Sequence, residues 1–249
     1  MARSVQGLRL SLGLLVAALC ASDGALVRSN LGYFKNTLDI RLDPAGLKVY
    51  RAARSQPPPK GPLLVFFGDS RALMWNAPPE LAGYETVNRG IGNQTTAQIL
   101  LRVGEDVAPL RPSVVVLEAG VNDLKSIAEF RSREDEIVSD CEANIATIVE
   151  GCRKTGARVV LLSVFDLGDV PLWRQPFWSD EVGKSIARVN AYLPSLVRDG
   201  VVLFDANEVL APNGDRVLPP FQLDYLHLSS VGYQALTERL TPLLPRLPQ

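Results

Sequence analysis

Short apolar runs alternate with stretches of helical periodicity from about residue 62 to the end of the chain. The apolar runs that predict strands are 63–67, 114–118, 158–164 and 201–204, and residues 85–88 predict a further, shorter strand. Between them, apolar side chains recur every three or four residues, and the predicted helices cover about 96–107, 133–154, 182–197 and 230–240. Strands that are apolar throughout are typical of a parallel sheet with helices on both faces. The pattern therefore predicts a single α/β domain in this part of the chain.

The first 22 residues have the pattern of an export signal. Arg3 and Arg9 precede an uncharged, mostly apolar run over residues 10–22, which is shorter than the roughly 20 residues that a membrane-spanning helix needs. We therefore expect a signal peptide over residues 1–22, with an uncleaved N-terminal anchor as the alternative. A signal of this kind predicts an exported protein, periplasmic or extracellular.

Two further segments follow the predicted signal. Residues 23–61 have mixed composition and end in a proline-rich stretch, which predicts a stiff lead-in rather than a core element. Residues 62–249 then contain all of the predicted strands and form the predicted catalytic domain.

Composition excludes several classes of function. The 249-residue chain carries 26 Lys and Arg against 27 Asp and Glu, so its net charge is −1, and the absence of a basic block argues against a nucleic-acid partner. Three cysteines and a single histidine, His227, cannot supply the usual zinc cluster. Cys141 and Cys152 lie eleven residues apart on one predicted helix, a separation of about 16 Å that is beyond disulfide reach. We expect both thiols to be free and buried, and any histidine base to be His227.

Polar motifs follow the predicted strands at their carboxyl ends, where parallel α/β folds bind ligands. In chain order the motifs are Gly68-Asp69-Ser70, Asn88 to Thr96, Gly120-Val121-Asn122-Asp123 and Asp224-Tyr225-Leu226-His227. Each has a structural explanation when taken alone, such as a helix cap, a turn or a surface histidine. Together they supply a serine nucleophile, a histidine with an acid three residues before it, and amide donors. This is the set of groups that acyl transfer requires.

The four motifs, in this order, resemble those of the SGNH hydrolases, also called the GDSL esterase/lipase family. The resemblance spans about residues 62–245 and implies a flavodoxin-like, three-layer α/β/α fold with a five-stranded parallel sheet. It also implies that Ser70 is the nucleophile, that His227 is the base and that Asp224 is the partner of His227.

The same resemblance implies an oxyanion hole with three donors. Two of them are the backbone N–H of Ser70 and the side-chain amide of Asn122. The third is a backbone N–H of the second motif, where the family's usual glycine aligns with Asn93. Because asparagine tolerates positive φ, Asn93 is an acceptable substitute, and Gly90 and Gly92 are the alternatives.

Two other features concern the surroundings of this predicted site. Arg71 stands where the family usually has an aliphatic residue, and we expect it either to approach an anionic substrate group or to point to solvent. The segment 165–180 follows the fourth predicted strand and carries Trp173, Phe177 and Trp178. It predicts either a wall of the substrate pocket or a surface loop.

The sequence therefore predicts an esterase or acylhydrolase that cleaves small acyl or acetyl esters, including those of carbohydrates or lysolipids. Its expected partner is a small-molecule ester, with no metal or organic cofactor, and it contacts a membrane only through a retained N-terminal segment. The alternatives are an acyltransferase on the same scaffold and a non-catalytic module that binds carbohydrate or a protein partner. An intact set of Ser70, Asp224 and His227 disfavours the binding module, which has no need of it.

Overall fold

The computed structural model describes residues 31, 32, 35, 38–57, 59–175, 178–214 and 216–247. Contacts divide the chain into two units, residues up to Pro44 and residues from Ala45 onward, and the second unit holds every predicted motif. In the first unit, residues 38–42 are helical. The predicted signal over residues 1–22 lies outside the described residues. Within the described part of the chain, no helix is long and apolar enough to cross a membrane.

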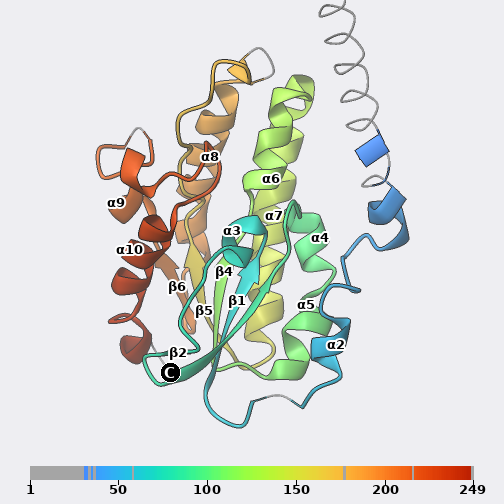
Figure 1. Ribbon diagram of the computed structural model, residues 1–249, viewed down its shortest axis with the longest axis vertical. Helices are drawn as coiled ribbons and strands as arrows, with labels where there is room; N and C mark the ends of the chain where they lie inside the picture. Colours follow the sequence, from blue (N-terminus) through green and yellow to red (C-terminus); the bar gives the residue numbers. More distant parts are fainter. Residues whose placement is uncertain are drawn as a thin grey trace, which may run out of the picture. The chain divides into compact units, whose positions relative to one another are not determined.

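A six-stranded sheet forms the middle of the second unit (Figure 1). Its strands are β1 (Leu63–Gly68), β2 (Glu80–Leu81), β3 (Tyr84–Gly90), β4 (Val114–Glu118), β5 (Arg158–Leu162) and β6 (Val201–Phe204). Their order across the sheet is β2-β3-β1-β4-β5-β6, and every neighbouring pair is parallel except β2 and β3. Gly68 is in register with Gly90 on one side and with Glu118 on the other, so three motifs begin at one edge of the sheet.

The sheet corrects the predicted number of strands from five to six. The additional strand, β2, has two residues and pairs with β3 through a tight turn at Ala82 and Gly83, where φ is +51° and +83°. Two consecutive positive φ angles are typical of hairpin turns whose twist suits antiparallel strands. A two-residue strand carries neither an apolar run nor an alternation, so the sequence pattern did not reveal it.

Helices cover both faces of the sheet, as predicted. They are α2 (Arg51–Arg54), α3 (Ser70–Leu73), α4 (Thr96–Leu100), α5 (Val103–Asp106), α6 (Val121–Leu124), α7 (Glu134–Arg153), α8 (Glu181–Tyr192), α9 (Asn207–Leu210) and α10 (Ser230–Leu240). Alternate strand residues point to opposite faces. Val65 and Phe67 pack in the cluster that includes α4, α5, α7 and α8, whereas Leu64 and Phe66 pack in the cluster that includes α9 and α10. The three α/β/α layers are confirmed.

The long helices lie close to their predicted bounds, but the predicted helix over 96–107 is interrupted. It consists of α4 and α5, with a break at Arg102, whose guanidinium turns inward to the ends of β1 and β3. Cys141 and Cys152 are free and buried in α7, which confirms the prediction for these thiols.

Part of the predicted lead-in, from Ala45 onward, belongs to the second unit and packs beside the second motif. The Ala45 carbonyl accepts a hydrogen bond from Gln94 Nε2 at 2.8 Å, and the Tyr50 hydroxyl donates to the Gly90 carbonyl at 2.5 Å. Through these two hydrogen bonds, residues that precede β1 in the chain contact the second motif.

Candidate active site

The first motif forms a tight turn between β1 and α3. Gly68 is required there because a Cβ at this position would lie 1.8 Å from the Glu118 carbonyl oxygen. Asp69 caps α3, and its Oδ1 accepts the Arg71 N–H at 2.8 Å. Ser70 is therefore the first residue of the helix, half-buried at the carboxyl end of β1.

The fourth motif brings the histidine to this serine. His227 Nε2 lies 2.9 Å from Ser70 Oγ, although the two residues are 157 positions apart in the chain. On the other side of the ring, His227 Nδ1 lies 2.8 Å from Asp224 Oδ2 and 3.1 Å from Asp224 Oδ1. Ser70, His227 and Asp224 thus form one connected set of hydrogen-bonding side chains.

The backbone of the fourth motif also binds the Asp224 carboxylate. Asp224 Oδ1 accepts the N–H groups of Leu226 and His227 at 2.7 and 2.8 Å. Partial burial acts to raise the pKa of Asp224, but the hydrogen bonds from the imidazole and from these two amides outweigh it and lower the pKa. Asp224 is therefore ionised at neutral pH and is a suitable acceptor for the Nδ1 proton of His227.

Asn122, the predicted side-chain donor, lies in α6 and is almost completely buried. Its Nδ2 donates to the Gln94 carbonyl at 3.0 Å, so the amide joins the third motif to the second. Of the three candidate backbone donors in the second motif, Gly90 is excluded, because its N–H already donates to Asn88 Oδ1 at 2.8 Å. Gly92 lies beside the nucleophile, since a Cβ built on it would be 4.0 Å from Ser70 Cβ.

Asn93 has a positive φ of +62°, a conformation that asparagine tolerates better than most residues do. Its side chain is exposed and accepts a hydrogen bond from Lys125 Nζ at 3.4 Å. Gly92 and Asn93 therefore remain the two candidates for the backbone donor of the second motif.

Asp123 supports this region in a way that sequence reasoning missed. Its carboxylate accepts the Thr96 N–H at 2.8 Å and the Thr96 hydroxyl at 2.7 Å, and thereby joins the third motif to the start of α4. Burial raises the pKa of Asp123 to about 6, although the Thr96 hydrogen bonds act to lower it. The only sequence signal was its place after Asn122 in the motif.

Two arginines lie buried beneath the site, and both predictions for Arg71 are wrong. The Arg71 side chain neither reaches solvent nor lines an open cleft, because it is fully buried against the Phe165 ring. Arg102 is likewise buried and donates to the carbonyls of Gly68 and Arg89 at 2.5 and 2.6 Å. Burial lowers the pKa of Arg102 to about 10, so it remains charged at neutral pH.

The segment after β5 has one tryptophan at the site and one in solvent. The Trp178 ring packs edge-on against Tyr225, a residue of the fourth motif, with ring centroids 5.3 Å apart. Trp173 is 71% exposed, as expected of a surface loop. Phe177 lies outside the described residues.

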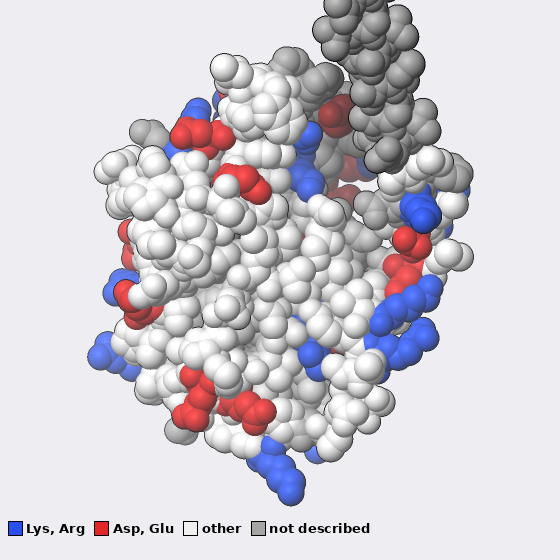
Figure 2. All heavy atoms as spheres, viewed as in Figure 1, with Lys and Arg blue, Asp and Glu red and all other residues white. Residues whose placement is uncertain are grey.

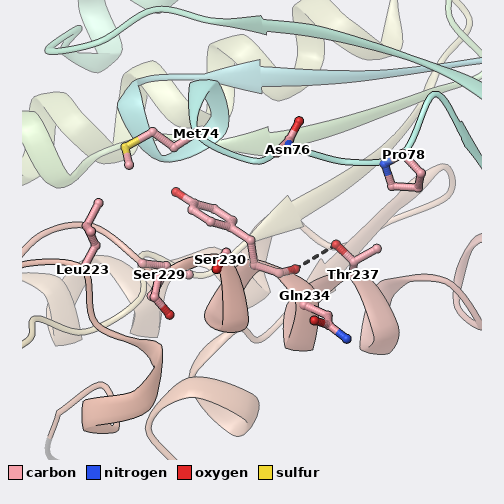
Figure 3. A pocket seen from close by; sticks show the side chains of 10 residues that line it. Met74, Asn76, Pro78, Leu223, Ser229, Ser230, Gln234 and Thr237 are labelled. Carbon is pink, nitrogen blue, oxygen red and sulfur yellow. Dashed lines mark hydrogen bonds between the residues drawn. The ribbon is translucent and has the colours of Figure 1, made fainter.

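A cavity of about 420 Å³ lies between the loop after α3 and the helix α10 (Figure 3). Met74 and Leu223 are at one end and Pro78 and Thr237 at the other. Leu223 precedes Asp224 in the chain, so the cavity begins close to the fourth motif. Its volume falls in the range of roughly 300–1,000 Å³ that small-molecule pockets occupy, which makes it a candidate site for a non-reacting part of a substrate.

Charged side chains do not dominate the face shown in Figure 2. The described acidic and basic residues lie singly or in small mixed groups around its edge, and the middle is mostly uncharged. Among the described residues, no group of three or more His, Cys, Asp or Glu is arranged to hold a metal ion.

Comparison with known proteins connects this geometry to a family. The model of the GDSL-like lipase/acylhydrolase family matches residues 66–235, which is more than half of the chain and includes all four motifs. The chain belongs to this family. A GDSL-like acylhydrolase is a carboxylic ester hydrolase, so the protein is an enzyme and not the non-catalytic binding module weighed above.

Relatives of this acylhydrolase cover most of its length. It is 26% identical over 223 residues to platelet-activating factor acetylhydrolase IB subunit alpha1 of Bos taurus, and the match covers 84% of this chain and 86% of the relative. A GDSL-like lipase from Bacteroides thetaiotaomicron has the same fold, with 23% identity, a TM-score of 0.62 and coverage of 81% of this chain and 98% of that chain. An acetylxylan esterase from Geobacillus stearothermophilus also shares it, with 18% identity, a TM-score of 0.57 and coverage of 74% and 94%. The SGNH hydrolase fold is thereby confirmed.

Proposed function

We propose that this acylhydrolase is a serine esterase that cleaves short acyl esters, with Ser70 as nucleophile, His227 as general base and Asp224 as the residue that orients the imidazole. The observation that carries the proposal is the continuous hydrogen-bonded path from Ser70 Oγ to His227 Nε2, at 2.9 Å, and from His227 Nδ1 to Asp224 Oδ2, at 2.8 Å. Each separation is within the range for proton transfer between a nucleophile, its base and the acid that orients the base.

The reaction has two halves. In the first, His227 Nε2 accepts the hydroxyl proton while Ser70 Oγ bonds to the carbonyl carbon of the ester. The tetrahedral intermediate then loses its alcohol, which takes the proton from His227, and an acyl group remains on Ser70. In the second half, water gives a proton to His227 and bonds to the same carbon, and the acid leaves as the proton returns to Ser70 Oγ.

The negative oxygen of each intermediate needs fixed donors. We assign this role to the Ser70 N–H, to Asn122 Nδ2 and to the backbone N–H of Gly92 or Asn93. Asn122 supports the assignment because it is almost fully buried and its amide is already oriented toward the second motif through Gln94. A buried, preoriented amide stabilises developing charge more than a solvated one does.

The proposal of short acyl groups is supported by the names of two similar proteins, both of which refer to the acetyl group. They are the platelet-activating factor acetylhydrolase subunit and the acetylxylan esterase. Acetylated carbohydrates and lysolipids are both candidate substrates. We also propose that the protein is exported, on the pattern of residues 1–22, and N-terminal sequencing of the mature protein tests this.

The decisive experiment pairs two serine variants. Ser70→Ala is expected to abolish labelling by a fluorophosphonate probe and to lower kcat on p-nitrophenyl acetate by on the order of a million-fold. Ser55→Ala is the matched control, because Ser55 is exposed, belongs to none of the four motifs, and donates its hydroxyl to the nearby Ala52 carbonyl. Labelling that persists in Ser70→Ala would refute the proposed nucleophile.

A panel of p-nitrophenyl esters from acetyl to long acyl, with acetylated sugars and lysolipids, then defines the substrate class. A preference for long acyl chains would contradict the proposal of short acyl groups. Product analysis with an added alcohol distinguishes hydrolysis from acyl transfer.

A further inference from the structure

Arg71 occupies an unusual place for a buried cation. Its side chain is fully buried, and its guanidinium carbon lies 3.6 Å from the centroid of the Phe165 ring. Nε donates to the Leu226 carbonyl and Nη1 donates to the Phe165 carbonyl, each at 2.9 Å. The side chain therefore joins the nucleophile turn to the histidine loop through backbone atoms.

The Leu226 carbonyl belongs to the peptide group that leads into His227. The oxygen of this peptide accepts from Arg71 Nε, and its N–H donates to Asp224 Oδ1 at 2.8 Å. Because a peptide group is planar, hydrogen bonds at both of its ends fix its orientation. The direction in which the His227 side chain leaves the backbone is thereby fixed as well.

The backbone of Arg71 is itself held on the nucleophile side. Its N–H donates to Asp69 Oδ1 at 2.8 Å, and its carbonyl accepts from the Tyr233 hydroxyl at 2.8 Å. Arg71 directly follows Ser70 in the chain, so a single residue connects the nucleophile and the peptide that carries the base.

Two buried carboxyl groups lie beside this arginine. Glu118 Oε1 is 3.8 Å from Arg71 Nη1, and Glu118 is in register with Gly68, the residue before Asp69. Among the described residues, Asp69 Oδ2 and both Glu118 oxygens have no hydrogen-bond partner. Burial, followed by the negative charge of Asp69, raises the pKa of Glu118 well above its ordinary value. Burial raises the pKa of Asp69 as well, although the hydrogen bond from the Arg71 N–H and the positive charge of Arg71 act to lower it. The guanidinium therefore lies beside two buried acids, both of which belong to the turn after β1 or to the neighbouring strand β4.

We propose that Arg71 is a positioning residue for ester hydrolysis, which keeps the His227 imidazole within hydrogen-bonding distance of Ser70 by holding the Leu226 carbonyl. The inference rests on the proposed roles of Ser70 and His227. It differs from a purely structural role, in which loss of Arg71 lowers only the fraction of folded protein.

Two substitutions test it. Arg71→Met keeps an unbranched side chain about as long as the aliphatic part of arginine, and it removes every side-chain donor. Arg71→Lys keeps the positive charge, but a single ammonium lacks the planar fork that reaches two carbonyls in fixed directions. With p-nitrophenyl acetate and active sites counted by fluorophosphonate, kcat is expected to fall about 100-fold in Arg71→Met and about 10-fold in Arg71→Lys, with KM within about threefold of wild type.

The proposed base can be observed without overlap from other imidazoles, because His227 is the only histidine in the sequence. Imidazole labelled with ¹⁵N therefore gives a single set of NMR signals, including the Nδ1 proton that bonds to Asp224. We expect this proton signal to be lost or broadened in Arg71→Met, without substrate and without turnover.

Arg102→Met is the matched control. Arg102 is also buried on a phenylalanine ring, Phe67, and also donates to backbone carbonyls, but these belong to Gly68 and Arg89 and not to the histidine loop. It is expected to lose stability as Arg71→Met does and to keep the Nδ1 proton signal of His227.

Three results would overturn the inference. The first is a folded Arg71→Met with kcat within twofold of wild type and unchanged imidazole signals. The second is loss of the His227 signal in Arg102→Met to the same degree as in Arg71→Met, which would indicate a general loss of stability. The third applies if Arg71→Met fails to fold, in which case Arg71→Lys is the test variant. Wild-type kcat together with wild-type imidazole signals in Arg71→Lys would then overturn the inference. Failure of the triad itself is separate, because it appears as activity in Ser70→Ala.

Discussion

Asp123 gives the stability of this esterase a pH dependence that one substitution can isolate. Its pKa is 3.8 in an unfolded chain and about 6 in the folded protein, because burial disfavours the charged form. The folded state therefore binds this proton more tightly than the unfolded state does. A group of this kind stabilises the folded protein most at low pH, and the contribution is lost as the pH rises through about 6.

The size of the effect follows from the two pKa values. The full shift corresponds to about 3 kcal/mol of unfolding free energy, and roughly 2 kcal/mol of it is gained between pH 7 and pH 4.5. With a urea dependence of about 2 kcal/mol per M, the contribution of Asp123 moves the unfolding midpoint by about 1 M. Urea titrations at the two pH values, followed by circular dichroism, measure it.

Asp123→Asn is the variant for this test, because asparagine has the same size and does not ionise. Its amide oxygen can still accept one of the two Thr96 donors. Other buried carboxyls, such as Glu118, titrate in both proteins and cancel in the comparison. We expect the change in unfolding free energy between pH 7 and pH 4.5 to be about 2 kcal/mol less favourable in the variant than in wild type. Equal pH dependence in the two proteins would show that the pKa of Asp123 is not raised in the folded state.

Three further outcomes are expected. Asn122→Ala lowers kcat about 100- to 1,000-fold, as loss of one oxyanion donor does, and near-normal turnover would remove this residue from the site. Trp178→Ala, which removes the ring packed against Tyr225, raises KM or changes the preferred ester, whereas Trp173→Ala at an exposed position does neither, and equal effects would contradict the contacts. Burial raises the pKa of Cys152 to about 12, so a thiol reagent modifies it in urea and not in the native protein, and rapid native reaction would indicate that the core is open.

The fold was predictable where the residues themselves carry a pattern. The four apolar runs and the long helix over Glu134–Arg153 were found because buried strands and amphipathic helices have distinct periodicities. The short segment 85–88 was also expected as a strand, and it forms part of β3, which is only partly buried. β2 was missed because two residues carry no period, and the break at Arg102 was missed because the apolar spacing of Ile99 and Val103 continues across it.

The candidate site likewise has residues that the sequence predicted and residues that it did not. Ser70, Asp224 and His227 were predicted as a set, and the structure brings them together, because their motifs end strands or precede a helix at one edge of the sheet. Arg71 was not predictable as a buried residue, since its partners are backbone carbonyls, which leave no mark in the sequence. The exclusion of Gly90 likewise depends on a hydrogen bond from its own N–H.

Arg71, Arg102 and Asp123, whose contacts sequence reasoning missed, share one feature. This feature explains how the motif residues are kept in fixed relative positions. The groups that would react lie on loops or at the starts of short helices, and these segments are joined to others by buried or half-buried charged side chains that bind backbone atoms. Arg71 binds the histidine loop, Arg102 binds the ends of β1 and β3, and Asp123 binds the start of α4. A buried charge with several hydrogen bonds costs a large penalty if one partner shifts, because the charge is then left without compensation. Such charges penalise displaced loop conformations more steeply than apolar contacts do, and this favours a preformed site in which little reorganisation is left for the moment of reaction.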